Sequence, residues 1–118
     1  MRENRIPLLL SADSNVTALV STRIFPDLAP RGALAPYVVY KLVGGNADTR
    51  IDGGRSFENL RVQVDCYAKE KDDAIALGLL CATAIETHGW LIGPNPSGRD
   101  SASNLYKDSA DYGLIENN

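Results

Sequence analysis

The sequence predicts an α+β domain in which an antiparallel β-sheet packs against one long α-helix, with a short helical segment at the N-terminus. In residues 60–68, apolar and polar side chains alternate strictly, which is typical of an antiparallel strand with one buried face. Residues 74–85 contain Thr83 as their only polar side chain, which is typical of a buried helix. A length of 118 residues, 44% of them hydrophobic, predicts a single domain over residues 1–118.

The chain opens with a weak helical pattern over residues 7–20, in which Pro7 suits the first helical turn. We expect this pattern to be broken near residues 13–15. Ser14 or Asn15 can cap a second short piece, because their side chains accept hydrogen bonds from free backbone N–H groups.

Strands are expected next. A short strand at residues 23–25 is stopped by Pro26, and the prolines and glycine of residues 26–36 exclude a helix or a central strand there. Residues 37–43 are β-branched and aromatic, which predicts a strand. The two glycines at residues 44–45 are expected to end it.

The second half of the chain contains the main helix and a last strand. Asp72 and Asp73 favour a helix start, because acidic side chains stabilise the positive end of the helix dipole. Gly89 is expected to end the helix as a left-handed cap. Residues 93–99, with two prolines, predict a loop, and residues 104–115 predict the final strand.

A polar loop is expected over residues 46–56, between two predicted strands. Its charged side chains alternate in sign: Asp48, Arg50, Asp52 and Arg55. Such a loop suits an exposed contact element, and it is equally compatible with an ordinary solvated loop.

Charge and hydropathy exclude several classes of protein. Twelve basic against fifteen acidic residues give a net charge of −3, which has the wrong sign for a phosphate-tracking nucleic-acid surface. The longest uncharged helical pattern has twelve residues, whereas a membrane span needs about 20. Residues 6–10 are too short for a signal peptide, so we expect an intracellular, reducing environment.

No catalytic or metal-binding motif is present in the sequence, and we expect neither enzyme activity, nor a metal, nor a cofactor. His88 is the single histidine, and its place near a helix end is explained by the helix dipole. Cys66 and Cys81 lie on apolar faces and are expected to be buried free thiols, close to each other.

The main helix carries two apolar stripes. The first has the spacing expected for packing on a sheet: Ile75, Gly78, Leu79, Ala82 and Ile85. The second is displaced around the helix: Leu77, Leu80, Cys81 and Ala84. A helix that is apolar all round needs cover on more than one side, either from the N-terminal helix or from a neighbouring subunit. We expect the second stripe to be a subunit interface.

Several stretches together resemble the small tail-completion, or tail-terminator, proteins of long-tailed phages. The first half of the resemblance lies in residues 13–20, 23–26 and 35–40. The second half lies in residues 61–68 and the alanine-rich helix that follows. In order and spacing the resemblance covers residues 8–112.

This resemblance implies a structural protein without catalytic residues. It implies a ring, often a hexamer, at the head-proximal end of the tail tube of a phage or prophage particle. The ring would stop tube polymerisation and join the tail to the head connector. Its partners would be further copies of itself, the tail tube protein and the head-tail connector protein, with no membrane and no sequence-specific nucleic acid. The protein would be assembled in the bacterial cytoplasm and would remain in the virion tail.

Two other classes of function remain open from the residues alone. One is a small dimeric α+β enzyme or ligand-binding domain, which would have a closed apolar pocket with convergent polar groups. The other is a regulatory or inhibitor module that docks one partner through a sheet edge. The mass in solution distinguishes these from a ring.

Overall fold

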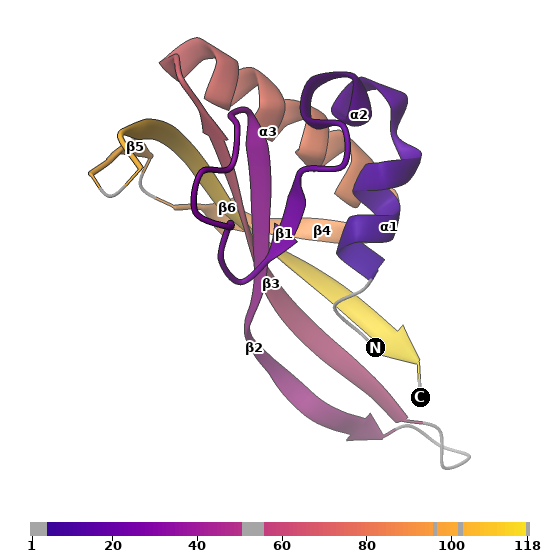
Figure 1. The fold of residues 1–118 in the computed structure, drawn as a ribbon. Coiled ribbons are helices and arrows are strands. Elements are labelled where there is room, and N and C mark those ends of the chain that lie inside the picture. Colours follow the sequence, from indigo (N-terminus) through magenta and orange to yellow (C-terminus); the bar gives the residue numbers. More distant parts are fainter. Residues whose placement is uncertain (1–4, 51–55, 96, 102, 118) are drawn as a thin grey trace.

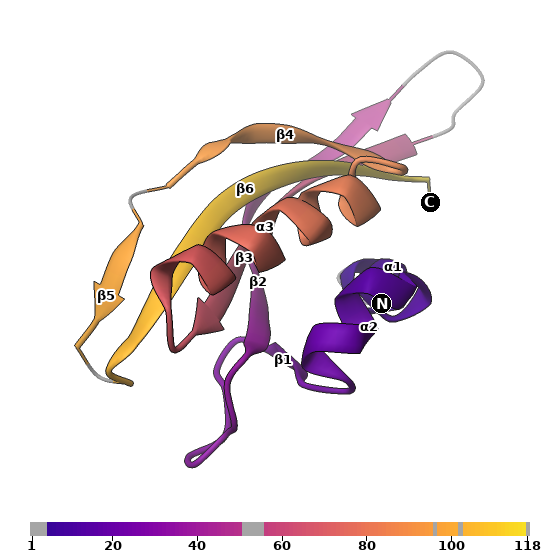
Figure 2. The same ribbon diagram turned by 90° about the horizontal axis from the view of Figure 1, so that it is seen from above.

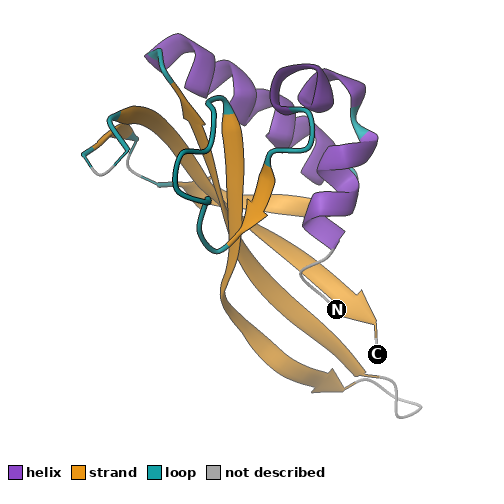
Figure 3. Cartoon of the chain, in the orientation of Figure 1, coloured by secondary structure: helices purple, strands orange, loops and turns teal. Residues whose placement is uncertain are grey.

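The strands form one sheet, and the helices lie together over one of its faces (Figures 1 and 3). The computed structural model describes the backbone of residues 5–50, 56–95, 97–101 and 103–117. It describes the side chains within residues 6–43, 61–95, 97–101 and 103–114. The helices are α1 (Arg5–Ala12), α2 (Ser14–Val20) and α3 (Lys71–Ile85). The strands are β1 (Ile24–Pro26), β2 (Tyr37–Arg50), β3 (Ser56–Ala68), β4 (Gly89–Pro94), β5 (Gly98–Asp100) and β6 (Leu105–Asn117).

The sheet confirms the predicted α+β class. Its order is β1-β2-β3-β6-β4, and β5 also pairs with β6. β1 runs parallel to β2, and the other pairs are antiparallel. In this order β1 and β4 lie at opposite ends of the sheet. The buried face predicted for β3 is confirmed where side chains are described, because Val62, Val64, Cys66 and Ala68 are all buried. The opposite face is not fully solvated as predicted, because Asp65 on it is buried as well.

The break between α1 and α2 is confirmed, but a different residue caps the second helix. Asp13 has an extended backbone, and its carboxylate accepts hydrogen bonds from the N–H groups of Asn15 at 2.9 Å and Val16 at 3.2 Å. The predicted cap at Ser14 or Asn15 was therefore one or two residues late. One oxygen of the Asp13 carboxylate thus satisfies two of the free N–H donors of the first turn.

The β2–β3 hairpin is longer than predicted. β2 does not end at the glycines but continues to Arg50, and β3 begins at Ser56. Pairing resumes after register shifts between Leu42 and Gly44 and between Asn46 and Thr49. Residues 46–50 and 56 of the expected loop are therefore strand, and residues 51–55 lie outside the described residues. In this region β3 pairs with β2 on one side and with the end of β6 on the other.

These strand ends project from the molecule. We call them the blade: β2 from Gly44, β3 up to Leu60, and β6 from Ile115. In Figure 1 the blade points away from the helices. The molecule measures 50 × 27 × 23 Å, and its radius of gyration of 14.7 Å exceeds the ~13.5 Å typical of a compact chain this long.

The end of α3 also differs from expectation. The helix ends at Ile85, and its C-cap, Glu86, has an ordinary right-handed conformation. Gly89 is not a left-handed cap but the first residue of β4. A Cβ at Gly89 would lie 2.4 Å from the carbonyl oxygen of Gly113, so the glycine permits close approach of two strands. The loop predicted over residues 93–99 is partly strand, in β4 and β5.

Candidate interaction surfaces

The predicted interface stripe on α3 belongs to the core. Leu77 and Cys81 are fully buried within one chain, Ala84 is nearly so, and Leu80 is partly buried against the core. The expectation that this stripe has no cover within the chain is wrong. Figure 2 shows α1 and α2 beside α3, and their buried side chains supply the cover: Ile6, Leu10, Val16 and Val20.

The stripe that was expected to face the sheet is partly exposed instead. Ile75 and Leu79, one helical turn apart, lie on the outer side of α3, and Leu79 is 66% exposed. Ile85, from the same predicted stripe, is buried. The core is thus centred on the other stripe, rotated around the helix from the predicted face.

Strand β4 presents an apolar edge. Trp90, Leu91 and Ile92 are consecutive, and each is between 43% and 46% exposed. Within the described residues β4 pairs with β6 alone, so its other side is an unpaired strand edge. A Cβ on Gly113 would lie 2.4 Å from the Trp90 ring, so this glycine makes room for the indole. Exposed apolar edges of this kind are sites of protein association.

A second apolar surface lies at the opposite end of the sheet. The loop that follows β1 carries Leu28 and Leu34, which are 82% and 73% exposed. Its start is held by the Asp27 N–H, which donates to the Tyr40 carbonyl at 2.8 Å. Its end is held by Arg23, which donates from Nε to the Pro36 carbonyl at 3.0 Å. The loop therefore protrudes from two fixed points.

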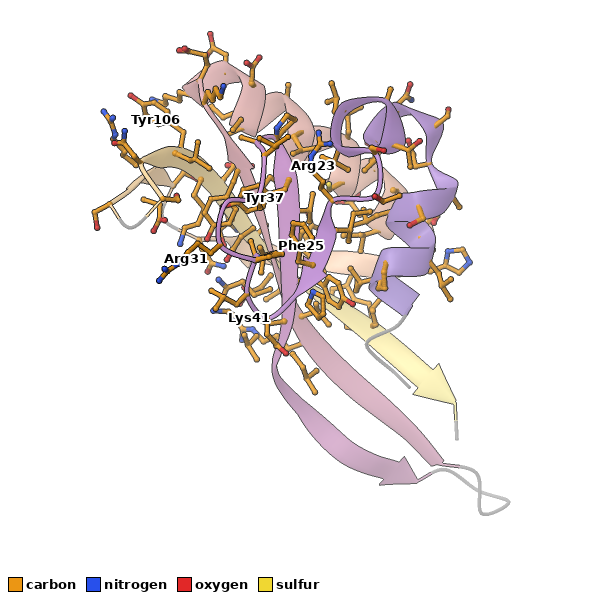
Figure 4. All side chains as sticks on the ribbon, in the orientation of Figure 1. Arg23, Phe25, Arg31, Tyr37, Lys41 and Tyr106 are labelled. Carbon is orange, nitrogen blue, oxygen red and sulfur yellow. The ribbon has the colours of Figure 1, made fainter. Side chains whose placement is uncertain are left out.

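Between this loop and the sheet lies an open groove of about 740 Å³. An aromatic cluster lies at one end of it. The rings of Tyr37 and Tyr67 stack with centroids 4.9 Å apart, and Phe25 meets Tyr37 edge-on at 5.9 Å. In Figure 4, Arg31 and Lys41 lie beside this cluster. The groove is open, and its lining mixes charged with apolar side chains, unlike the closed apolar pocket expected of a small-molecule site.

Burial and nearby charges shift the pKa values of several side chains around the groove. Burial, followed by the nearby carboxylates of Asp65 and Asp100, raises the pKa of Tyr67 to about 12. Burial and the charge of Asp100 likewise raise the pKa of Tyr37. The hydrogen bond from Ser103 Oγ to Asp100, 2.6 Å long, lowers the pKa of that carboxyl. These groups stay in their ordinary charge states near neutral pH.

A polar network on the same face, built around the buried Asp65, Ser109 and Asp111, holds the segment after β4. Asn95 Nδ2 donates to Asp111 Oδ1 at 2.6 Å and to Ser109 Oγ at 3.2 Å. Arg61 Nε donates to the other oxygen of Asp111 at 2.8 Å, and Ser109 Oγ donates to Asp65 at 2.5 Å. In the sequence, Asp65 alternates with the residues of the buried face and would be expected to face water. Its partner Ser109 on β6 is 44 residues away in the chain and is brought beside it by strand pairing.

The two cysteines lie together in the core, as expected. Their sulfur atoms are 3.8 Å apart, and both thiols are free and buried. The hydrogen bond with Cys81, together with burial, raises the pKa of Cys66 well above its ordinary value. His88 is exposed, and its Nδ1 lies 2.8 Å from Thr87 Oγ1. No group of three or more metal-ligating side chains occurs among the described residues.

The charged residues predicted for the contact loop are only partly described. Asp48 and Arg50 lie in strand β2, within the blade. Asp52 and Arg55 lie outside the described residues. In the part of the chain that the structure describes, no helix is long and apolar enough to cross a membrane.

Comparison with known proteins adds two findings. Residues 6–96 match the family model described as "Tail completion protein gp17". The fold is similar to that of a solved chain from the "Virion of native gene transfer agent (GTA) particle". That match has a TM-score of 0.63 and 16% sequence identity, and it covers 96% of this chain and 92% of the other. No curated protein matches.

Proposed function

Because the chain belongs to the tail completion protein gp17 family, we propose that it forms the ring that ends the tail tube of a phage-like particle on its head-proximal side. The family confirms the expected resemblance and makes this a structural protein of such a tail. In the proposed role, the ring stops tube polymerisation and joins the tail to the head connector. Its partners are further copies of the chain, the tube protein and the connector protein.

The observation that carries this proposal is the blade. Its strands pair with one another beyond the region where the helices lie over the sheet (Figure 1). Ribbons of a few strands without a covering layer are only marginally stable in water. Contact with a tail component or with the neighbouring subunit would give this part of the sheet the missing layer.

A ring is also consistent with the position of the exposed apolar side chains. A closed ring repeats one heterologous contact, in which two different surfaces of the same chain meet. The apolar edge of β4 and the loop after β1 are two such surfaces, at opposite ends of the sheet. A two-fold dimer would need one self-complementary surface instead.

Deletion of the coding sequence from the particle that carries it tests the proposed function. We expect tubes of irregular length and heads without joined tails, both counted by negative-stain microscopy. Supplying the wild-type chain in trans should restore tails of uniform length joined to heads. Particles with normal, joined tails in the absence of the chain would overturn the proposal.

A further inference from the structure

We propose that the ion pair between Arg61 and Asp111 is a strut that sets the angle at which the blade leaves the helix-covered body of the molecule. In this role Arg61 is a positioning residue, which acts on the tail only through the direction of the blade. The inference rests on the proposed function, in which the blade makes the contact with the tail or the neighbouring subunit. It adds the side chains on which the geometry of that contact depends.

The first argument is that the sheet changes at the base of the blade. β4 begins at Gly89, which pairs with Leu114, and beyond this row the described part of β6 pairs with β3 alone. On the other flank, β2 changes its register against β3 between Leu42 and Gly44. Irregularities of this kind bend a strand and redirect it. The direction of the blade is therefore decided at this row of the sheet.

The second argument is the position of Arg61 in the same row. Its pairing partners on the two neighbouring strands are both glycines, Gly44 on β2 and Gly113 on β6. Side chains opposite each other are the usual lateral contacts between strands, and a glycine offers none. Among the described residues, the side chain of Arg61 instead hydrogen-bonds to Asp111, further into the body on β6. Its Nε and Nη2 lie 2.8 and 2.7 Å from the same carboxylate oxygen.

The third argument is that Asp111 is itself fixed to the body. It is buried, and its other oxygen accepts a hydrogen bond from Asn95 Nδ2 at 2.6 Å. The Asn95 N–H in turn donates to the carbonyl of Ser109 at 2.9 Å. The side chain of Arg61 is 51% exposed, so the pair joins a half-exposed group at the base of the blade to an anchored carboxylate. Two N–H groups of one planar guanidinium also fix its orientation.

Distances between spin labels in solution test the strut. One label is attached at Asp48→Cys in the blade and the other at Thr83→Cys on the exposed side of α3, because the chain's own cysteines are buried. Arg61→Ala and Asp111→Asn should each broaden the distribution of distances between the labels. Asp111→Asn keeps the shape of the side chain and an oxygen for Asn95. The two substitutions combined should broaden the distribution no further than either alone, since both remove the same contact.

Two further variants are matched controls. Arg99→Ala also removes an arginine whose Nε and Nη2 hydrogen-bond to a single oxygen, that of Asn104 at the other end of the sheet. It should leave the distances unchanged. Arg61→Lys keeps the positive charge and should restore part of the narrow distribution. All of these variants should keep the circular dichroism spectrum of the wild type.

Tail completion in particles is the functional readout. Arg61→Ala should reduce completed tails toward the number seen without the chain, whereas Arg99→Ala should match the wild type. Distances that stay unchanged in both Arg61→Ala and Asp111→Asn would overturn the strut. A broadened distribution with a normal number of completed tails would overturn the positioning role. Unfolding of both variants would overturn it as well, because the pair would then stabilise the body itself.

These outcomes are distinguishable from a failure of the proposed function. Normal, joined tails in particles that lack the whole chain would overturn that function, while the distances measured in solution would still establish the strut. Conversely, the loss of the strut leaves the phenotype of the complete deletion untouched.

Discussion

Leu77 and Leu79 lie two residues apart on α3, yet Leu77 is fully buried and Leu79 is 66% exposed. Leu77 contacts the core formed by the sheet and the two N-terminal helices. Leu79 points away from that core. A leucine side chain is therefore expected to contribute strongly to the stability of the fold at position 77 and little at position 79.

Alanine substitutions provide a direct comparison. Leu77→Ala should lower the free energy of unfolding by about 2–5 kcal/mol, because it removes buried methyl groups and leaves a cavity. Leu79→Ala should change it by less than about 0.5 kcal/mol. Urea unfolding followed by circular dichroism measures both. Equal effects would contradict the assignment of the buried stripe.

The cysteine pair is expected to be protected rather than reactive. The raised pKa of Cys66 and the burial of both sulfur atoms keep the thiolate population low. A disulfide reagent at pH 8 should titrate two thiols per chain after denaturation without reductant, and react far more slowly with the native protein. A count near zero in the denatured sample, without intermolecular dimers, would mean that the two cysteines are oxidised to each other.

Tyr67 links stability to alkaline pH. Its pKa of about 12 in the folded protein lies above the ordinary value of 10, so folding favours the protonated phenol. The stability that this provides is complete below about pH 10 and is lost as the pH rises to about 12. Tyr67→Phe should show a smaller loss of unfolding free energy over that interval, with tyrosinate absorbance measured in parallel. An identical loss in both proteins would contradict the assignment.

At the scale of the elements, the blade and β4 differ in what they contribute to the fold. The blade lies outside the helix-covered core, whereas β4 is attached to it through pairing with β6 and through Asn95 and its hydrogen bonds. Shortening the blade should therefore be tolerated by the folded state, since its strands extend beyond the region that the helices cover.

Deletion of residues 48–55, with a two-residue Asn-Gly turn in their place, tests this. The thermal midpoint should stay within a few degrees of the wild type, while tail completion should be lost. An insertion of eight residues after residue 101, between β5 and β6, is a control for altered loops in general. Completed tails with the shortened hairpin would show that the blade is not the contact element.

At the scale of the whole molecule, the sheet order separates three surfaces. The loop after β1 lies at one end, the apolar edge of β4 at the other, and the blade projects from the helix-covered body. A subunit with this layout can join two neighbours and still present a third element to a different protein. That combination fits the proposed ring on the end of a tail tube.

Much of this architecture could be predicted from local pattern. The alternation over residues 60–68, the acidic start of α3 and the break near Asp13 each depend on neighbours a few positions away in the chain. The proximity of Cys66 and Cys81 followed from their places on facing apolar surfaces. The family resemblance also rested on short stretches in the right order.

The interaction surfaces depended on tertiary structure. α3 is apolar nearly all round, so its sequence contains no preferred face, and the packing of α1 and α2 decided which stripe became core. The polar residues of the blade became strand because β2 and β6 pair with β3 from both sides. Trp90, Leu91 and Ile92 form a visible apolar run in the sequence. Their position on an uncovered edge, however, is set by the order of strands, which arises from contacts between residues far apart in the chain.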